Sequence, residues 1–338
     1  MILNVRRISM KQYRWVSLGC GDIAQQIAQA MEQKNTTLYG VANRTYEKAV
    51  AFAEKYHIPN VYKKIEDVFI DDDVDVVYIA TPHNTHISYI LEALKHGKHV
   101  LCEKSVTLNS QELMQAVELA KEKNLVLAEA MTIYHMPLYK KLSQIIKTGK
   151  LGELRFIQMN FGSYKEYDGT NRFFNPNLAG GALLDIGVYA LSFVRWFMTE
   201  TPNQIVSQVK LAPTGVDEQA GILLMNEKQE MATVSLSLRA KQPKRGMVAF
   251  EKGYIEIYNY PRGKEAVITY TDSSEKEVIQ EQDSVLALCY EVNDMEQTIE
   301  QGNPFDSENP MHLDYTIDVM NIMTKLRNDW GLKYPEEQ

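Results

Sequence analysis

The run Gly19-Cys20-Gly21-Asp22-Ile23-Ala24 decides the fold of this chain. It follows an apolar run, Trp15-Val16-Ser17-Leu18, and leads into a helix-like run over residues 23–31. A strand, a tight glycine turn and the start of a helix are the parts that bind a dinucleotide pyrophosphate. The run therefore predicts a dinucleotide-binding unit, although a tight turn in any strand–helix unit can produce the same short pattern.

The small residues of this run each have a physical role. Gly19 permits the turn, Gly21 lets the backbone approach the phosphates, and Ala24 allows close packing of helix on strand. The helix N-terminus at Asp22 and Ile23 presents free N–H groups and the positive end of its dipole to the anion. We therefore expect Gly19, Gly21, Asp22 and Ile23 to bind the cofactor.

Length and composition limit the possible classes of protein. The chain has 338 residues, which suits two domains, and its net charge of −8 argues against nucleic acid or an anionic membrane as a general partner. Cys20, Cys102 and Cys289 are far apart, so they predict neither a disulfide framework nor a zinc site and indicate a reducing, cytoplasmic location. No apolar run approaches the ~20 residues of a membrane span. Residues 1–10 lack the features of a signal peptide and are either a loose arm or an upstream extension.

The first part of the chain alternates between strand-like and helix-like runs, and its strands are almost continuously apolar. Such strands are buried on both faces of a parallel sheet. The pattern predicts a doubly wound α/β (Rossmann) domain over residues 13–130, with a capped helix beginning at Ser110. The expected strands are 13–18, 37–42, 74–80, 99–102 and 125–129, with a short one near Val61, and the expected helices are 23–33, 46–56, 85–96 and 110–123.

The second part of the chain is richer in short strands punctuated by turns. It predicts an α+β domain over residues 131–338, with a large open, mostly antiparallel sheet that needs cover on at least one face. The expected strands are 153–161, 204–211, 220–225, 231–238, 247–250, 254–258 and 266–270, and the expected helices are 137–147, 181–198, 284–301 and 311–328.

The end of the second strand indicates which dinucleotide binds. Folds that bind NAD usually place an acidic residue there for the ribose hydroxyl. Here the strand ends in Asn43-Arg44-Thr45, without a carboxylate, and Arg44 can pair with a 2′-phosphate while Asn43 donates to it. We therefore predict NADP(H) rather than NAD(H), with NAD(H) as the second choice. The alternative is that Arg44 is only a solvated loop residue.

Two further runs stand at the carboxyl edge of the predicted sheet. The first, Thr81-Pro82-His83-Asn84-Thr85-His86, predicts cofactor contacts from Thr81, Pro82, Asn84 and His86. Capping of the next helix explains Asn84 or Thr85 equally well, and His86 is alternatively a surface histidine on that helix.

The second run ends in Glu103-Lys104-Ser105, where Glu103 and Lys104 are expected at the cofactor. An ammonium at a nicotinamide site can hydrogen-bond a substrate hydroxyl and help to move its proton. A lysine at a strand end is otherwise a solvated charge.

A second group of candidate residues lies in the other predicted domain. A Gly-Gly turn at 180–181 opens a helix on which Asp185 and Tyr189 stand four residues apart on one face. Tyr189 is a poor base at its ordinary pKa of ~10, and a nearby Lys104 cation and a helix N-terminus would both favour the phenolate. The alternative is an aromatic residue of the core with Asp185 serving the helix dipole. Candidates for a substrate pocket are Tyr164, Arg172, Phe173, Asp185 and Tyr189.

Taken together, these motifs resemble the glucose–fructose oxidoreductase/inositol dehydrogenase (Gfo/Idh/MocA) family over most of the chain. Within it, the chain is most similar to the branch of dimeric trans-dihydrodiol dehydrogenases and NADP-dependent D-xylose dehydrogenases, because Tyr189 stands where many relatives have histidine. The motifs that match in order are residues 19–24, 80–86, 97–104 and 180–187, and the closing run 331–335 also resembles that branch.

The resemblance implies hydride exchange between a nicotinamide and a sugar, cyclitol or trans-dihydrodiol. It implies that Lys104 and Tyr189 transfer the proton, that Asp185 orients the substrate or the lysine, and that the open sheet pairs in a homodimer or a higher homo-oligomer. One position departs from the family, since Ser105 replaces a proline that often follows a cis bond.

Two alternatives to a sugar or diol dehydrogenase remain open. One is a keto-sugar (anhydrofructose-like) reductase, and the other is a non-catalytic regulator that senses NADP. The presence of Lys104, Asp185 and Tyr189 favours catalysis, because a pure sensor would be free to lose them. No metal site is expected, because the histidines show no ligand spacing, and the run 71–73 is expected to be a turn.

Overall fold

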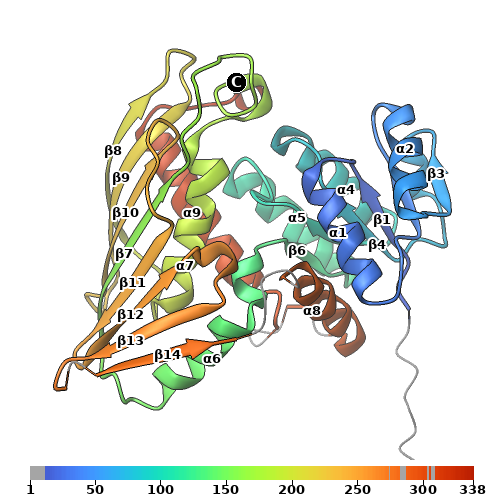
Figure 1. The fold of residues 1–338 in the computed structure, drawn as a ribbon. Helices are drawn as coiled ribbons and strands as arrows, with labels where there is room; N and C mark the ends of the chain where they lie inside the picture. Colours follow the sequence, from blue (N-terminus) through green and yellow to red (C-terminus); the bar gives the residue numbers. More distant parts are fainter. Residues whose placement is uncertain (1–11, 274, 282–286, 303, 306–308) are drawn as a thin grey trace, which may run out of the picture.

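The computed structural model describes residues 12–273, 275–281, 287–302, 304–305 and 309–338. Figure 1 shows a first half built on one sheet, sheet A, and a second half built on a larger sheet, sheet B. The expected arm at residues 1–10 lies outside the described residues.

Sheet A is parallel and has six strands in the order β3-β2-β1-β4-β5-β6. Its central strands are completely buried, as their continuous apolar sequences predict. The predicted doubly wound sheet is confirmed, although several strands begin later than expected because the apolar runs extend beyond the hydrogen-bonded ladder. The strands are β1 Trp15–Leu18, β2 Gly40–Ala42, β3 Asn60–Tyr62, β4 Val76–Ile79, β5 His99–Cys102 and β6 Leu127–Glu129.

The helices of the first half differ from the predictions mainly at their starts. The side chain of Asn109, not of Ser110, caps α5 by accepting a hydrogen bond from the backbone N–H of Glu112 at 2.9 Å. The helix expected from Thr85 is preceded by a 3₁₀ turn, η1 (His83–Thr85). The helices are α1 Asp22–Gln33, α2 Tyr46–Tyr56, α3 Glu66–Phe69, α4 His86–Lys95 and α5 Ser110–Lys123.

Sheet B has eight strands in the order β14-β13-β12-β11-β7-β10-β9-β8, and only the β7–β10 pair is parallel. The expected open, mostly antiparallel sheet is confirmed. The edge strand β14 was not predicted because its sequence, Lys-Glu-Val-Ile-Gln, carries few apolar residues. The strands are β7 Leu154–Gly162, β8 Gln204–Leu211, β9 Asp217–Met225, β10 Met231–Ser237, β11 Arg245–Phe250, β12 Gly253–Tyr258, β13 Glu265–Tyr270 and β14 Lys276–Gln280.

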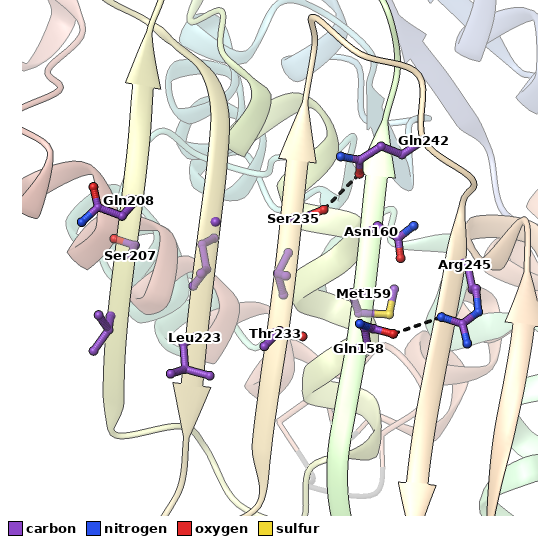
Figure 2. Close-up of a pocket in the computed structure, with 14 residues that line it drawn as sticks. Gln158, Met159, Asn160, Ser207, Gln208, Leu223, Thr233, Ser235, Gln242 and Arg245 are labelled. Atoms are coloured by element: carbon purple, nitrogen blue, oxygen red, sulfur yellow. Dashed lines mark hydrogen bonds between the residues drawn. The ribbon is translucent and has the colours of Figure 1, made fainter.

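Within the described residues, helices leave one face of sheet B open and cover the other. Helices α7 (Val188–Phe197) and α9 (Leu313–Asp329) pack on each other and on this face, between sheet B and the first half, while α6 (Pro137–Lys147) lies at one end (Figure 1). The strands alternate accordingly, so that Ile255 is buried and Tyr254 is exposed. Figure 2 shows the other face, where side chains such as Gln158 and Leu223 stand on the strands without a covering helix in the described part of the chain.

The helix α8 (Ala287–Gln301) returns from the second half of the sequence to the first half of the structure (Figure 1). It packs against α1, and Trp15 Nε1 donates to Glu296 Oε1 at 3.1 Å while Lys34 Nζ lies 2.7 Å from Glu296 Oε2. Buried Leu288, Val292 and Met295 belong to the same apolar cluster as Trp15. The division into domains at residue 130 stays a prediction, and the core of the first half includes residues from beyond that boundary.

One segment is long and apolar enough to cross a membrane by length and composition alone. It spans residues 176–197, and its most apolar window has a mean hydropathy of 1.4. The expectation that no run approaches a membrane span was therefore too strong. In the fold 83% of that window is buried, which is typical of a core helix.

Candidate active site

A cavity of about 420 Å³ lies between the two halves, at the carboxyl edge of sheet A. The strand order reverses between β1 and β4, and ligands of doubly wound sheets bind beside this point. Both halves contribute side chains to the cavity. Among the predicted residues, the cavity is lined by Gly21, Asp22, Ile23, Thr81, Pro82, Glu103, Lys104, Arg172, Asp185 and Tyr189.

The glycine loop has the geometry that a pyrophosphate requires. Gly19 has φ +108°, and a Cβ atom there would lie 2.3 Å from the carbonyl oxygen of Ala80. Gly21 has open space around it and begins α1 without a side-chain cap, so the first N–H groups of the helix keep no side-chain partner. These residues fit a dinucleotide phosphate at the helix N-terminus.

Asn43 and Arg44 follow β2 directly beside this loop, since the N–H of Gly19 donates to the carbonyl of Ala42 at 2.8 Å. Asn43 Nδ2 donates to the carbonyl of Thr45 at 3.0 Å, and Arg44 is exposed. Neither residue lines the cavity, so their contact with a ribose phosphate stays a prediction.

The two histidines after β4 have different surroundings. His83, which the sequence analysis did not select, lines the cavity, and its Nε2 lies 3.0 Å from the carbonyl oxygen of Lys104. Burial, followed by the charges of His86 and Lys104, lowers the pKa of His83 to about 3, so the ring is neutral at neutral pH.

His86 is fully buried behind the cavity wall. Its ring nitrogens lie 3.0 Å from the carbonyl oxygen of Ser105 and 2.9 Å from that of Thr81. Burial lowers its pKa, and a neutral ring donates to only one of these carbonyls. His86 therefore joins two loops of the site, and the structure does not place it in the cavity.

Asn84 also lies outside the cavity and caps no helix. Its Nδ2 donates to the carbonyl of Asn177 at 3.2 Å and to Glu336 Oε1 at 2.7 Å. Thr85 makes no capping bond either, and its hydroxyl donates to the carbonyl of Pro82 at 2.7 Å. The capping interpretation of these two residues is therefore wrong, and Asn84 instead connects the first half to the second.

Lys104 joins the two halves within the cavity. Its Nζ donates to the carbonyl of Asp185 at 2.8 Å, lies 3.5 Å from Asp185 Oδ1 and lies 4.8 Å from the centre of the Tyr189 ring. Burial lowers its pKa, but the electrostatic effects of Tyr189, Asp185 and Glu103 outweigh burial and raise the pKa overall. Lys104 is thus a cation at neutral pH, and the bond that joins it to Ser105 is cis.

Asp185 is an ionised carboxylate between two cations. Its Oδ1 lies 3.2 Å from Arg172 Nη1, and the Lys104 ammonium approaches the same oxygen. Burial raises the pKa of Asp185, but Lys104, Arg172 and His83 lower it below its ordinary value. The carboxylate thus fixes the position of both Lys104 and Arg172.

Tyr189 is protonated in this arrangement. Burial raises its pKa above the ordinary value of 10.0, and Glu103 and Asp185 add to the increase while Lys104 opposes it. The expectation that Lys104 favours the phenolate is confirmed, since its charge lowers the pKa of Tyr189, but burial outweighs this effect and the net shift is upward. The phenol at neutral pH is a proton donor.

Residues far away in the sequence position the segment that carries Asp185 and Tyr189. Asp185 lies in a π-helical turn, η4 (Leu183–Gly187), a feature that often occurs at functional sites. Asp217 Oδ2 in β9 accepts from the N–H of Leu183 at 2.6 Å. Gly181 has φ +127°, and a Cβ atom there would lie 2.2 Å from Asp217 Oδ1, so the turn accommodates only glycine beside this carboxylate.

Residues 331–338, here called the tail segment, support the same turn. Tyr334 is fully buried, and its hydroxyl donates to the carbonyl of Gly180 at 2.7 Å. Arg327 lies 4.7 Å from the Tyr334 ring and makes two hydrogen bonds to the carboxylate of Glu337, at 2.7 and 2.8 Å. Because Asn84 binds Glu336, the tail segment joins loops of both halves around the cavity.

The predicted substrate residues are only partly gathered at the cavity. Phe173 lies beside it, with Arg172 Cζ 4.2 Å from its ring. Tyr164 is 59% exposed, outside the cavity, with Arg239 Cζ 6.0 Å from its ring. Sequence reasoning also missed Gln26, which lines the cavity and stands four residues after Asp22 on the same face of α1.

Among the described residues, no group of three or more histidine, cysteine, aspartate or glutamate side chains could hold a metal ion. The residues that line the cavity include proton donors and acceptors beside a glycine loop of the dinucleotide-binding type.

Two family models match the chain. Residues 13–131 match an oxidoreductase family with an NAD-binding Rossmann fold, and residues 139–256 match the GFO/IDH/MocA C-terminal domain. Among curated proteins, trans-1,2-dihydrobenzene-1,2-diol dehydrogenase from Xenopus laevis is 30% identical over 302 residues, which cover 87% of this chain and 90% of that protein. The protein of the same name from Sus scrofa is 26% identical over 338 residues, covering 96% and 99%.

Solved structures share the whole fold. A 3-ketoreductase from Actinomadura kijaniata in complex with NADP and TDP-benzene superimposes with a TM-score of 0.83 at 22% identity, covering 94% of this chain and 98% of that one. An aldose–aldose oxidoreductase from Caulobacter crescentus complexed with glycerol gives 0.81 at 20% identity, covering 94% and 97%. With both domain models matched, the chain belongs to the Gfo/Idh/MocA family of oxidoreductases.

Proposed function

We propose that this oxidoreductase transfers a hydride between NADP(H) and a hydroxyl or carbonyl carbon of a sugar, cyclitol or trans-dihydrodiol. The observation that carries the proposal is the meeting of Lys104, Asp185 and Tyr189 in one cavity with the glycine loop. The bound nicotinamide supplies the hydride acceptor or donor. The dihydrodiol dehydrogenases that share up to 30% of its sequence support this class of substrate.

The side chains have complementary roles in this reaction. Lys104, a cation anchored by Asp185, donates a hydrogen bond to the substrate oxygen and stabilises negative charge on it. The Tyr189 phenol gives its proton to that oxygen during carbonyl reduction and takes the hydroxyl proton during oxidation. Because the pKa of Tyr189 is raised, the oxidation rate should increase with pH in the alkaline range while reduction proceeds at neutral pH.

The choice of NADP(H) rests on Asn43 and Arg44. Arg44 is exposed beside the glycine loop, so its guanidinium could pair with a 2′-phosphate bound there. The turn at residues 43–45 carries no carboxylate that would repel this phosphate. The 3-ketoreductase of the same fold was solved with NADP. Dissociation constants for NADPH and NADH, measured for wild type and Arg44→Ala, test this choice, and an unchanged preference in the variant would refute it.

The central test is turnover in two variants of the cavity. Nicotinamide absorbance is followed with NADP⁺ and a panel of aldoses, cyclitols and trans-diols, and with NADPH and keto-sugars. Lys104→Met and Tyr189→Phe should each lose turnover by ~10²–10⁴-fold, the usual size of acid–base contributions, while the Kd for NADPH stays unchanged. Rates near wild type in both variants would contradict these roles.

The same panel distinguishes the two alternatives. A keto-sugar reductase would turn over only in the direction of carbonyl reduction, which the protonated state of Tyr189 supports. A regulator would bind NADPH but show no turnover and would capture a protein partner only when NADPH is present.

We also propose that two copies of the chain pair through the open face of sheet B. This face carries exposed Val206 and Leu223 and a shallow hollow of about 780 Å³ (Figure 2). A second copy of the same sheet, packed face to face, would cover these apolar side chains. Sedimentation analysis of wild type against Val206→Arg/Leu223→Arg should show a dimer converted to a monomer, and a monomeric wild type would refute the proposal.

A cytoplasmic location and a separate substrate-binding and dimerisation domain over residues 131–338 remain part of this proposal. The free thiols of Cys20, Cys102 and Cys289 support a reducing compartment. Cell fractionation tests the location.

A further inference from the structure

Three cations lie on neighbouring loops at the end of sheet B that faces the cavity. Lys165 follows β7, Lys244 precedes β11, and Arg262 ends the 3₁₀ turn η5 (Tyr260–Arg262). The backbone joins the last two, because the N–H of Asn259 donates to the carbonyl of Lys244 at 2.7 Å and the N–H of Arg262 donates to the carbonyl of Asn259 at 3.0 Å. The chain as a whole has a net charge of −8, so this group is a local concentration of positive charge on an acidic protein.

Aromatic rings connect these cations to the reacting groups. Lys244 Nζ lies 4.8 Å from the centre of the Phe161 ring, and that ring lies 6.1 Å from the Tyr189 ring. On the other side, Lys165 Nζ lies 4.5 Å from the ring of Phe173, the neighbour of Arg172 in the cavity wall. Each lysine is thus one aromatic ring away from the site.

Arg262 connects the same group to the cofactor side. Its Nη2 donates to Gln26 Oε1 at 2.6 Å, and Gln26 lines the cavity. Arg262 also acts on buried acids, because its charge lowers the pKa of Glu103 and of Glu291 against the larger effect of burial. Arg262 thus stabilises the charged forms of these two acids and repels Lys244.

In contrast, neither lysine forms an ion pair with a carboxylate among the described residues, whereas Lys210 and Arg172 near this end of the sheet pair with Glu218 and Asp185. Burial lowers the pKa of Lys244, and the charges of Lys165 and Arg262 lower it further. Cations that repel one another beside a cavity are stabilised by an anion that binds between them.

We propose that the substrate carries an anionic group, a phosphate or a carboxylate, which Lys165 and Lys244 bind while its reacting carbon lies at Lys104 and Tyr189. This inference rests on the proposed function and narrows it from neutral sugars and diols to anionic ones. The buried Phe161 ring lies between Lys244 and Tyr189 and so separates the proposed anion site from the reacting groups.

The first test measures binding and does not depend on turnover. The protein is first saturated with NADPH, so that the sites that bind the cofactor's phosphates are filled. It is then titrated with inorganic phosphate while the nicotinamide fluorescence is recorded. Wild type should bind phosphate saturably, and Lys165→Met/Lys244→Met should bind it about tenfold more weakly, as expected for two charge-assisted contacts. The matched control is Lys147→Met/Lys228→Met, which removes the same charge from exposed lysines elsewhere and should bind like wild type.

The second test identifies the anion on one carbon skeleton. D-glucose, D-glucose 6-phosphate and D-glucuronate are titrated in the same assay with the same variants. Tighter binding of the 6-phosphate identifies a phosphate ester, and tighter binding of the glucuronate identifies a carboxylate. In both cases the advantage over glucose should disappear in the double variant at Lys165 and Lys244.

Two results would overturn the inference. One is equal binding of all three compounds by wild type, and the other is an equal loss of phosphate affinity in the test and control double variants. Failure of the proposed function is a separate outcome, since it would appear as unaltered turnover in Lys104→Met or as absent NADPH binding.

Discussion

The two walls of the cavity are built in different ways. The first half contributes a wall of backbone, in which Gly19 and Gly21 act through the absence of a side chain. The second half contributes a helical segment whose position depends on side chains far away in the sequence. The carboxylate of Asp217 binds it from 34 residues away, and the hydroxyl of Tyr334 binds it from 154 residues away. A short sequence motif thus forms the cofactor wall, whereas the substrate wall takes its position only when distant parts of the chain have folded together.

The largest expected effect breaks the backbone wall. Gly19→Ala would place a Cβ atom 2.3 Å from a backbone oxygen at a positive φ, so we expect a loss of more than about 4 kcal/mol in the free energy of unfolding. Gly21→Ala, with no neighbour within 4 Å, should keep its stability and lose affinity for NADPH. Urea unfolding and NADPH titration of both variants provide the measurement. Equal stability of the two would show that the turn tolerates a side chain.

A smaller effect tests the buried carboxyl of Asp217, which supports the substrate wall. Burial raises the pKa of Asp217 to about 7, from an ordinary value of 3.8. The folded protein therefore holds this proton more tightly than the unfolded chain, so its contribution to stability is complete below pH 4 and is lost as the pH rises through 7. The loss is at most about 4 kcal/mol, and Asp217→Asn, which keeps an acceptor for Leu183, should remove it. Unfolding curves at pH 5, 7 and 8 check this, and parallel pH profiles for the two proteins would contradict it.

The smallest effect concerns the tail segment. Tyr334→Phe keeps the ring beneath Arg327 but removes the bond to the carbonyl of Gly180, which should cost about 1 kcal/mol in stability. Because that bond positions the turn before Asp185, kcat should fall while the Kd for NADPH stays constant. Tyr270→Phe, which loses a hydroxyl bond to Glu277 far from the cavity, is the matched control. If both variants change kcat equally, the tail segment has no specific effect on the site.

The sequence indicates which residues of the cofactor wall lie at one edge of the sheet, because its signals are local. The glycine turn, the buried strands and the run ending in Lys104 each need only their neighbours to be recognised, and the structure gathers most of these residues in the cavity. His86 shows the limit of this approach. Its place behind the wall follows from carbonyls on two separate loops, which no spacing in the chain reveals.

The substrate wall was harder to predict for a related reason. The structure brings Asp185 and Tyr189 together in the cavity, but their spacing in the sequence does not reveal that burial by the rest of the fold exceeds the effect of Lys104 on the pKa of Tyr189. Neither Asp217 nor the tail segment showed a pattern that connects it with residues 180–189. Such long-range hydrogen bonds leave no periodicity in the sequence.

The return of α8 to the first half also determines how the molecule can move. The chain crosses between the halves near residue 131 and on both sides of α8, so three covalent connections join them. Helix α8 packs on α1, and α9 packs on α5 as well as on α7, so packing joins the two halves in addition to the chain crossings. Both halves line the cavity, so a displacement of one half against the other that changes its width would also disturb the packing of α9 on α5.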